Sequence, residues 1–453
     1  MWDVMNQGAR PAGQGFVRRV LLGLGLWIFC GCAEATRPPN IVVLISDDQD
    51  FTHFGFAGHQ LARTPVVDAM AASGVTFSHA YVPMSRCRPA QAALMSGQWP
   101  HQNGIYYNVG ADHIDPTRSI ANRLKDKGYE CFGEGKFWEH DPRKMGFVNY
   151  KIGNYDTFAR RGQEHLFEFL DARDASQPFL LWWAPELPHV PHNPPARLLD
   201  MIDPAGIEVP EWYAGEREEF IEKERASLAM GAWLDEAIGE LRDHLESIDQ
   251  LDNTLFLFLI DNGYANGQPS KGTAFEKGLR TPAILSGAGI EAAGQVHGEL
   301  VSALDLYATL LDYASASSPN DAPSKSLRPL IEGQPYSAQE ALYGVIYTQS
   351  STQSDSDPAR DAYGIWAVTK KWKYIEYLQE VRQSQDSKYH IQSNLCDYPE
   401  RDRGDIDLFD LENDPDERRN LSQDPAHAGE IERLRQGALA WWSESGGTAL
   451  NMP

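Results

Sequence analysis

The sequence predicts an α/β fold: a large, mixed but mostly parallel β-sheet sandwiched by helices, with a smaller C-terminal α/β domain. Two continuous apolar runs, residues 40–46 and 255–260, carry this prediction. Strands buried on both faces of a helix-covered parallel sheet are apolar throughout. Further segments alternate between strand and helix patterns, as in α/β proteins. The expected helices are residues 64–73, 87–96, 119–127 and 226–248, and the expected strands are residues 75–82, 129–132 and 179–184.

Length and composition allow two domains and exclude one class of function. The chain has 453 residues, of which 42% are apolar, enough for a large domain and a smaller one. We expect the larger domain over residues 38–335. The smaller one, residues 336–453, is expected to contain a small antiparallel sheet with a hairpin at 363–377, and a closing helix at 430–442. The net charge of −24 argues against non-specific nucleic-acid binding, which requires a basic surface.

The first 35 residues have the pattern of an export signal peptide. Arg18 and Arg19 precede an apolar run at residues 20–29, and Ala33-Glu34-Ala35 fits a cleavage site. We therefore expect a periplasmic or extracellular protein with no transmembrane span, because this run is too short to cross a bilayer. Cys32 offers the alternative of a lipid anchor. Cys131 and Cys396 could form a disulfide or stay buried thiols, since spacing alone does not decide.

Acidic and amide side chains follow both apolar runs directly. Asp47 and Asp48 end the first run, and Asp261 and Asn262 end the second. Ligands of parallel sheets bind outside the carboxyl ends of the strands, so these four side chains are expected at one edge. Four oxygen-bearing groups suit Ca²⁺ or Mg²⁺ better than zinc. The alternative is that each pair only forms a turn, since Asp and Asn are common turn residues.

A cysteine lies at the start of a predicted helix of small residues. Cys87 precedes Arg88-Pro89, and the helical run continues to Ser96 and Gly97. Proline suits the first turn of a helix. Free N–H groups and the helix dipole favour an anion there, so we expect a reactive thiol.

In their order and spacing, these features resemble the type I sulfatases of the alkaline-phosphatase superfamily. The resemblance extends from Pro39 to about Leu421. The matching segments are residues 39–48, 87–97, Gly135-Lys136, Pro188-His189, and residues 261–263, 271–282, 305–311 and 408–421. The stretches around Lys136 and His189 are also somewhat similar to the iduronate sulfatase branch, which favours a sugar substrate.

This resemblance implies a mechanism. Cys87 would be oxidised to formylglycine by a formylglycine-generating enzyme and would supply the nucleophile that attacks a sulfate ester. One Ca²⁺, or Mg²⁺, would activate that group. The residues implied to hold the cation are Asp47, Asp48, Cys87, Asp261 and Asn262; those implied to bind the sulfate are Lys136, Lys271 and His189. His140 is the implied base for sulfate release, and His189 the contact or acid at the leaving oxygen.

Two residues depart from the family pattern. Gln91 stands where the signature has arginine, and His140 lies one position beyond the usual histidine. The first departure keeps an alternative open: an unmodified Cys87 would leave a non-catalytic protein that binds sulfated glycans. A second alternative is a phosphodiester or phosphonate ester hydrolase on the same scaffold. Otherwise the implied activity is hydrolysis of sulfate esters on a carbohydrate.

Overall fold

A large sheet forms the centre of the protein in the computed structural model. The structure describes residues 37–108, 114–139, 141–153, 159–291, 293–347, 361–382, 400–448, 450 and 452–453. The eight strands of the large sheet lie in the order β4-β3-β5-β1-β6-β7-β2-β8. Their bounds are β1 Asn40–Ser46, β2 Val75–Tyr81, β3 Glu130–Gly135, β4 Asn149–Ile152, β5 Phe179–Ala184, β6 Thr254–Ile260, β7 Ala283–Gly287 and β8 Gln295–Ser302. Only β7 runs antiparallel to its neighbours in this sheet, which confirms the mixed, mostly parallel prediction.

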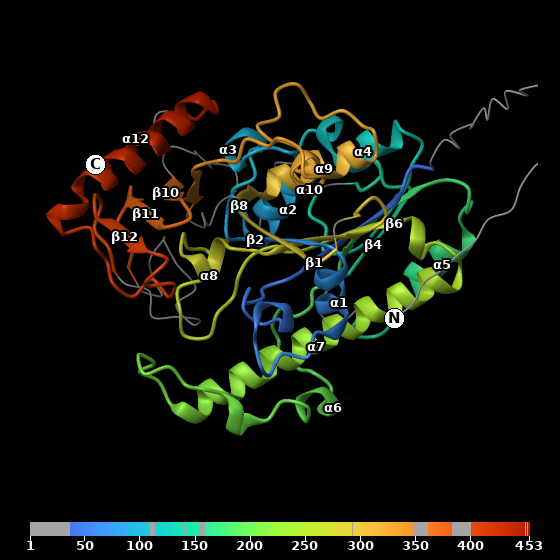
Figure 1. The fold of residues 1–453 in the computed structure, drawn as a ribbon, viewed down its shortest axis with the longest axis horizontal. Helices are drawn as coiled ribbons and strands as arrows, with labels where there is room; N and C mark the ends of the chain where they lie inside the picture. The colour runs from blue at the N-terminus through green and yellow to red at the C-terminus, as the bar shows by residue number, and fades with distance from the viewer. Residues whose placement is uncertain are drawn as a thin grey trace, which may run out of the picture. The chain divides into compact units, whose positions relative to one another are not determined.

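Helices cover both faces of this sheet. The longer ones are α1 Pro65–Ser73, α2 Cys87–Ser96, α4 Ile120–Lys125, α5 Glu164–Ala172, α7 Arg217–Ser247 and α9 Ala303–Tyr313. In Figure 1, α2, α4 and α9 lie above the strands, and α1 and α7 lie below them. The structure begins α7 earlier than residue 226, since Glu218 and Glu219 occupy its first turn, where carboxylates favour a helix dipole.

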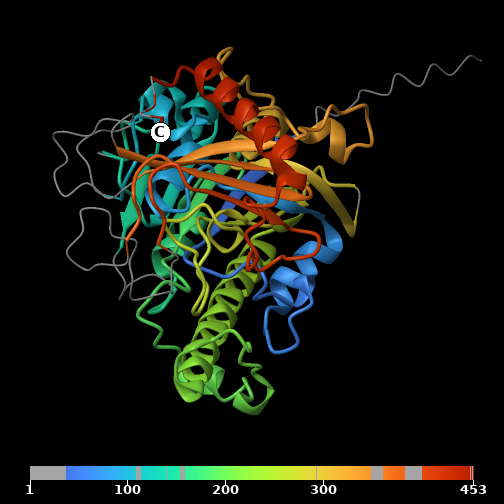
Figure 2. The ribbon, with the colours of Figure 1, turned by 90° about the vertical axis from the view of Figure 1, so that its left-hand side faces the viewer.

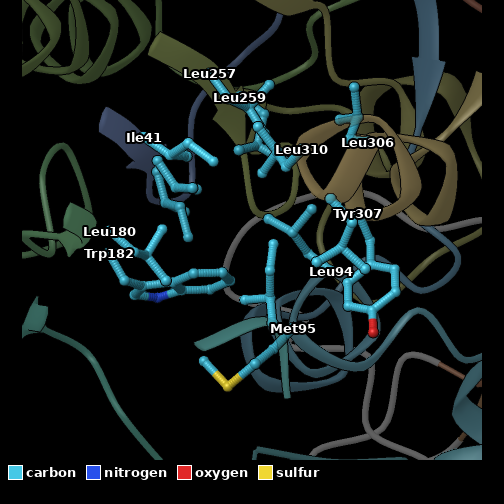
Figure 3. Close-up of a cluster of buried hydrophobic side chains, with 14 of the residues drawn as sticks. Ile41, Leu94, Met95, Leu180, Trp182, Leu257, Leu259, Leu306, Tyr307 and Leu310 are labelled. Carbon is cyan, nitrogen blue, oxygen red and sulfur yellow. The ribbon is translucent and has the colours of Figure 1, made fainter. Parts of the chain in front are cut away.

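The core has one buried layer on each face of the large sheet, and successive side chains of β5 point alternately into the two layers. Trp182 packs with the α2 and α9 side of the core, and Trp183 packs with the α1 and α7 side. Figure 3 shows Met95 of α2 beside Trp182, and Leu94 of α2 beside Tyr307 of α9. Both tryptophans are fully buried, which confirms that they belong to the core.

A second, antiparallel sheet follows in the C-terminal part, in the order β12-β11-β10-β9. The strands are β9 Leu342–Tyr347, β10 Ala362–Val368, β11 Trp372–Tyr377 and β12 Ile406–Asp410, and the closing helix is α12 Ala428–Glu444. β10 and β11 form the predicted hairpin, and α12 packs against the sheet (Figure 2). Residues 37–453 make one compact unit, so the domain boundary at residue 335 stays a prediction.

The remaining elements are short. They are α3 Pro100–Asn103, α6 Ala196–Leu199, α8 Glu276–Leu279 and α10 Arg328–Ile331, with 3-10 turns at Gly55–Ala57, Pro116–Arg118, Pro204–Gly206, Leu251–Asn253 and Pro425–His427. None of the helices in the described ranges has the length and apolar character that a bilayer crossing demands. The predicted signal peptide, Cys32 and Cys396 lie outside the described residues. Cys131 is a buried free thiol.

Candidate active site

The polar side chains predicted at the carboxyl edge of the sheet do come together. β1 and β6 are adjacent and in register, Ser46 opposite Ile260, so both end at the same level. The backbone N–H of Asp261 donates to Ser46 O at 2.9 Å, and the N–H of Asp48 donates to Asp261 Oδ1 at 3.3 Å. Asp48 has a φ of 54°, an uncommon conformation for a residue with a side chain, which aims its carboxylate into the site.

Cys87 faces this edge from the first turn of α2. Its thiol lies 3.7 Å from Asp47 Oδ1 and 3.8 Å from Asp48 Oδ1, and the side chain is fully buried. Burial and the nearby Asp261 raise the pKa of the Cys87 thiol above its ordinary range. Desolvation and the nearby carboxylates thus oppose the effect of the helix N-terminus on this thiol, and its reactivity stays a prediction.

Two lysines complete the surroundings of Cys87. Lys271 Nζ is 2.6 Å from both carboxylate oxygens of Asp48 and 3.2 Å from the sulfur. Lys136 Nζ pairs with the Asp47 carboxylate and lies 3.6 Å from the sulfur. Burial alone would lower the pKa of each lysine. Asp48 raises the pKa of Lys271 above its ordinary value, and Asp47 does the same for Lys136. The paired carboxylates therefore favour the charged form of both lysines beside Cys87.

His189 and His192, three residues apart in the chain, lie in different surroundings. His189 Nε2 lies 3.2 Å from Asp48 Oδ2, while its Nδ1 donates to Val190 O at 2.7 Å. His192 instead packs its ring edge-on against Tyr264, and burial lowers the pKa of His192 to about 4. His189 is thus the histidine placed in the site. His140 lies outside the described residues, so its role stays a prediction.

The donor atoms at this edge fit a hard divalent cation. One ligand atom from each of Asp47, Asp48, Cys87 and His189 lies within 4.8 Å of the others. Asn262 Oδ1 is buried and receives no hydrogen bond from the described residues. An orphaned amide oxygen beside carboxylates is the arrangement that Ca²⁺ or Mg²⁺ satisfies.

Gln91 occupies the same site, one turn along α2 from Cys87. Its Nε2 donates to Asp261 Oδ2 at 2.9 Å. Burial, followed by the charge of Asp47, raises the pKa of Asp261 well above its ordinary value. The residue that replaces the signature arginine therefore orients one of the expected metal ligands, but adds no charge.

The structure adds two residues that the sequence prediction did not include. Arg86, immediately before Cys87, is only 6% exposed. Glu186 has a φ of 58°, and burial raises its pKa to about 7 despite the charge of Lys136. The sequence signal for Arg86 was a charged residue directly before the predicted helix of Cys87. Glu186 had no such signal, because its proximity to the site depends on loop geometry.

Comparison with known proteins identifies the family. The family model described as Sulfatase matches residues 39–316, more than half of the chain. The chain belongs to the sulfatase family. It is therefore an enzyme that hydrolyses sulfate esters, within the alkaline-phosphatase superfamily. A second model, N-sulphoglucosamine sulphohydrolase, C-terminal, matches residues 267–394.

Individual sulfatases are similar over most of their length. An ulvan-active sulfatase of Formosa agariphila is 25% identical over 91% of this chain and 81% of its own. The human N-acetylgalactosamine-6-sulfatase is 26% identical over 86% of this chain and 83% of its own. The narrower resemblance to the iduronate sulfatase branch stays a prediction.

Solved structures confirm the fold. One is a protein described in complex with its substrate D-glucosamine-2-N,6-O-disulfate, with a TM-score of 0.74 at 18% identity. The match covers 90% of this chain and 98% of that one. A phosphonate monoester hydrolase from Silicibacter pomeroyi has a TM-score of 0.71 at 18% identity, with 90% of this chain and 96% of that one covered.

Proposed function

We propose that this sulfatase removes sulfate from a carbohydrate, using a formylglycine made from Cys87 and one divalent cation. The observation that carries the proposal is the set of contacts around Cys87: two lysines and two carboxylates lie within 3.8 Å of its sulfur. Such a position offers a nucleophile, a cation site and a positively charged seat for sulfate oxygens at one point.

Membership of the sulfatase family supports modification of Cys87, because that family generally uses a formylglycine. Oxidation to formylglycine supplies a hydrated aldehyde in place of the thiol. A bound divalent cation supplies Lewis acidity, which lowers the pKa of a hydroxyl group at this position. Maturation would need a formylglycine-generating enzyme that accepts Gln91 in its recognition sequence.

The residues around Cys87 have distinct proposed tasks. Lys136 and Lys271 bind the sulfate oxygens and neutralise charge as the S–O bond to the alcohol breaks. His189, oriented by its Nδ1–H···O bond to Val190, contacts the ester oxygen and donates a proton to the leaving group. Asp47, Asp48, Asp261 and Asn262 hold the cation, which we propose to be Ca²⁺, with Mg²⁺ as the alternative. His140 is proposed as the base for sulfate release.

A sulfated carbohydrate is the proposed substrate because the similar proteins are named for such substrates. They include an ulvan-active sulfatase and an N-acetylgalactosamine-6-sulfatase. We also propose export of the mature protein, supported by the signal-peptide pattern over residues 1–35. The phosphonate ester hydrolase alternative is supported by the similar fold of one such enzyme.

The test is mass spectrometry of the peptide Cys87–Arg118 combined with turnover assays. The protein is produced with a formylglycine-generating enzyme, and Cys87→Ala is the control. We expect formylglycine in the peptide, and release of sulfate that the control lacks. Matched aryl sulfate and aryl phosphonate esters are compared in the same assay. Faster turnover of the phosphonate would favour the second alternative, and an unmodified thiol with glycan binding but no turnover would favour a non-catalytic binding protein.

A further inference from the structure

Arg86 is a buried cation directly before Cys87, and no described residue pairs with it. It precedes α2, is 6% exposed, and its Nε is buried without a hydrogen-bond partner; no ion pair or cation–π contact joins its guanidinium to a described residue. The neighbouring cations differ in this respect. Arg88 donates to Glu139 at 3.1 Å, and Lys136 and Lys271 pair with Asp47 and Asp48.

The guanidinium of Arg86 lies beside Gly272, the neighbour of Lys271. A Cβ atom added to Gly272 would be 2.9 Å from Arg86 Nη2, so the guanidinium packs directly on this part of the backbone. The segment is held there, because Gly272 N donates to Ser85 O at 2.7 Å and Tyr363 donates to Gly272 O.

An unpaired buried charge costs folding free energy, which a bound anion would offset. Burial opposes the charge of Arg86, but a guanidinium stays protonated in proteins. Its planar fork matches a carboxylate or a sulfate with two parallel hydrogen bonds. The adjacent lysines already face Cys87 and would bind the sulfate that is hydrolysed. Arg86 is therefore left for a different anionic group.

We propose that Arg86 binds a second anionic substituent of the substrate, a carboxylate or a further sulfate, next to the sulfate ester that is cleaved. This proposal rests on the proposed function, because the ligand is a group on the same carbohydrate. It makes Arg86 a specificity-determining residue for glycans that carry two neighbouring anions. The site lacks the positive charge of the signature arginine, because Gln91 stands at that position within α2. It has a positive charge at Arg86, just before α2 begins.

The test compares pairs of substrates that differ by one anion. One pair is glucosamine-2-N,6-O-disulfate and glucosamine-6-O-sulfate; the other is a sulfated uronate disaccharide and its methyl ester. We measure kcat/KM for wild type, Arg86→Gln, Arg86→Lys and the control Arg225→Gln. The control removes a guanidinium bound to the Leu199 and Ile202 carbonyls, away from the site. We expect Arg86→Gln to reduce the preference for the second anion about 10- to 100-fold, and Arg86→Lys about 3- to 10-fold.

The pair that loses its preference identifies the second anion as sulfate or carboxylate. An unchanged preference in Arg86→Gln for both pairs would overturn the proposal, as would an equal loss in Arg225→Gln. Melting temperature provides a second readout. Arg86→Gln should melt at or above the wild-type temperature, because it removes an uncompensated buried charge; a clear decrease would instead indicate a structural role.

A binding measurement tests the role of Arg86 independently of the proposed function. Calorimetric titration of the same sugars into Cys87→Ala and Cys87→Ala/Arg86→Gln needs no turnover. Weaker binding of only the dianionic sugars in the double variant would support the role of Arg86, even if wild type hydrolysed none of them. Equal affinities in the two variants would overturn it.

Discussion

A buried ion pair between the small sheet and helix α8 is expected to be a major contribution to stability. Lys373 of β11 is fully buried, and its Nζ lies 2.8 Å from Glu276 Oε1 of α8. Glu276 also accepts a hydrogen bond from Tyr81 OH at 3.0 Å, and Arg280 lies 3.6 Å away. α8 follows closely after Lys271, so this pair connects the small sheet to the segment that carries an active-site cation.

Replacing Lys373 by methionine removes the ammonium but keeps most of the apolar stem. Breaking a buried pair typically costs about 3–5 kcal/mol, because the remaining charge is uncompensated. Arg280 and Tyr81 still face Glu276, so we expect the lower end, about 3 kcal/mol. For a folded unit of this size, with an unfolding entropy of roughly 0.9 kcal/mol per degree, the melting temperature should fall by about 3–4 °C.

Scanning calorimetry of a double-mutant cycle tests this reasoning. Glu276→Gln combined with Lys373→Met leaves no buried charge from the pair, so the double variant should lose less stability than the two single losses added together. A change below about 1 °C in Lys373→Met, or strict additivity in the cycle, would show that the pair does not stabilise the junction.

Three further predictions concern the site and its surroundings. Lys271→Met should reduce kcat/KM for an aryl sulfate by about 100-fold or more, with formylglycine content unchanged by mass spectrometry. Gln91→Ala should weaken calorimetric Ca²⁺ binding about 10- to 100-fold, since Gln91 orients Asp261, whereas the exposed control Gln60→Ala should not; equal affinities would contradict this. Glu224 lies 2.7 Å from His53 and raises its pKa, although burial alone would lower it. The charge of Asp50 also raises the pKa of His53, and the charge of Lys277 lowers it. This stabilisation is complete below the unfolded pKa of His53 and is lost as pH rises through the folded one. The melting-temperature loss of Glu224→Gln should therefore be larger at pH 6 than at pH 9, and a loss independent of pH would refute the assignment.

Much of the fold and of the metal edge follows from local sequence. The apolar runs of β1 and β6 favoured buried strands, and the acids that end them reach the same edge because the strands are parallel neighbours. The position of Cys87 at a helix start was equally predictable, because proline and small residues act locally. These features depend on periodicity and on turn chemistry, which are properties of consecutive residues.

The tertiary structure alone decided the electrostatics. Nothing near Cys87 in sequence indicates that burial and Asp261 raise its pKa, that Lys271 pairs with Asp48, or that Arg86 Nε is buried without a hydrogen-bond partner among the described residues. That His189 faces Asp48 while His192 packs on Tyr264 also depended on how the loop folds back. The physical reason is that charge interactions depend on burial and on distances between residues far apart in the chain, which only packing determines.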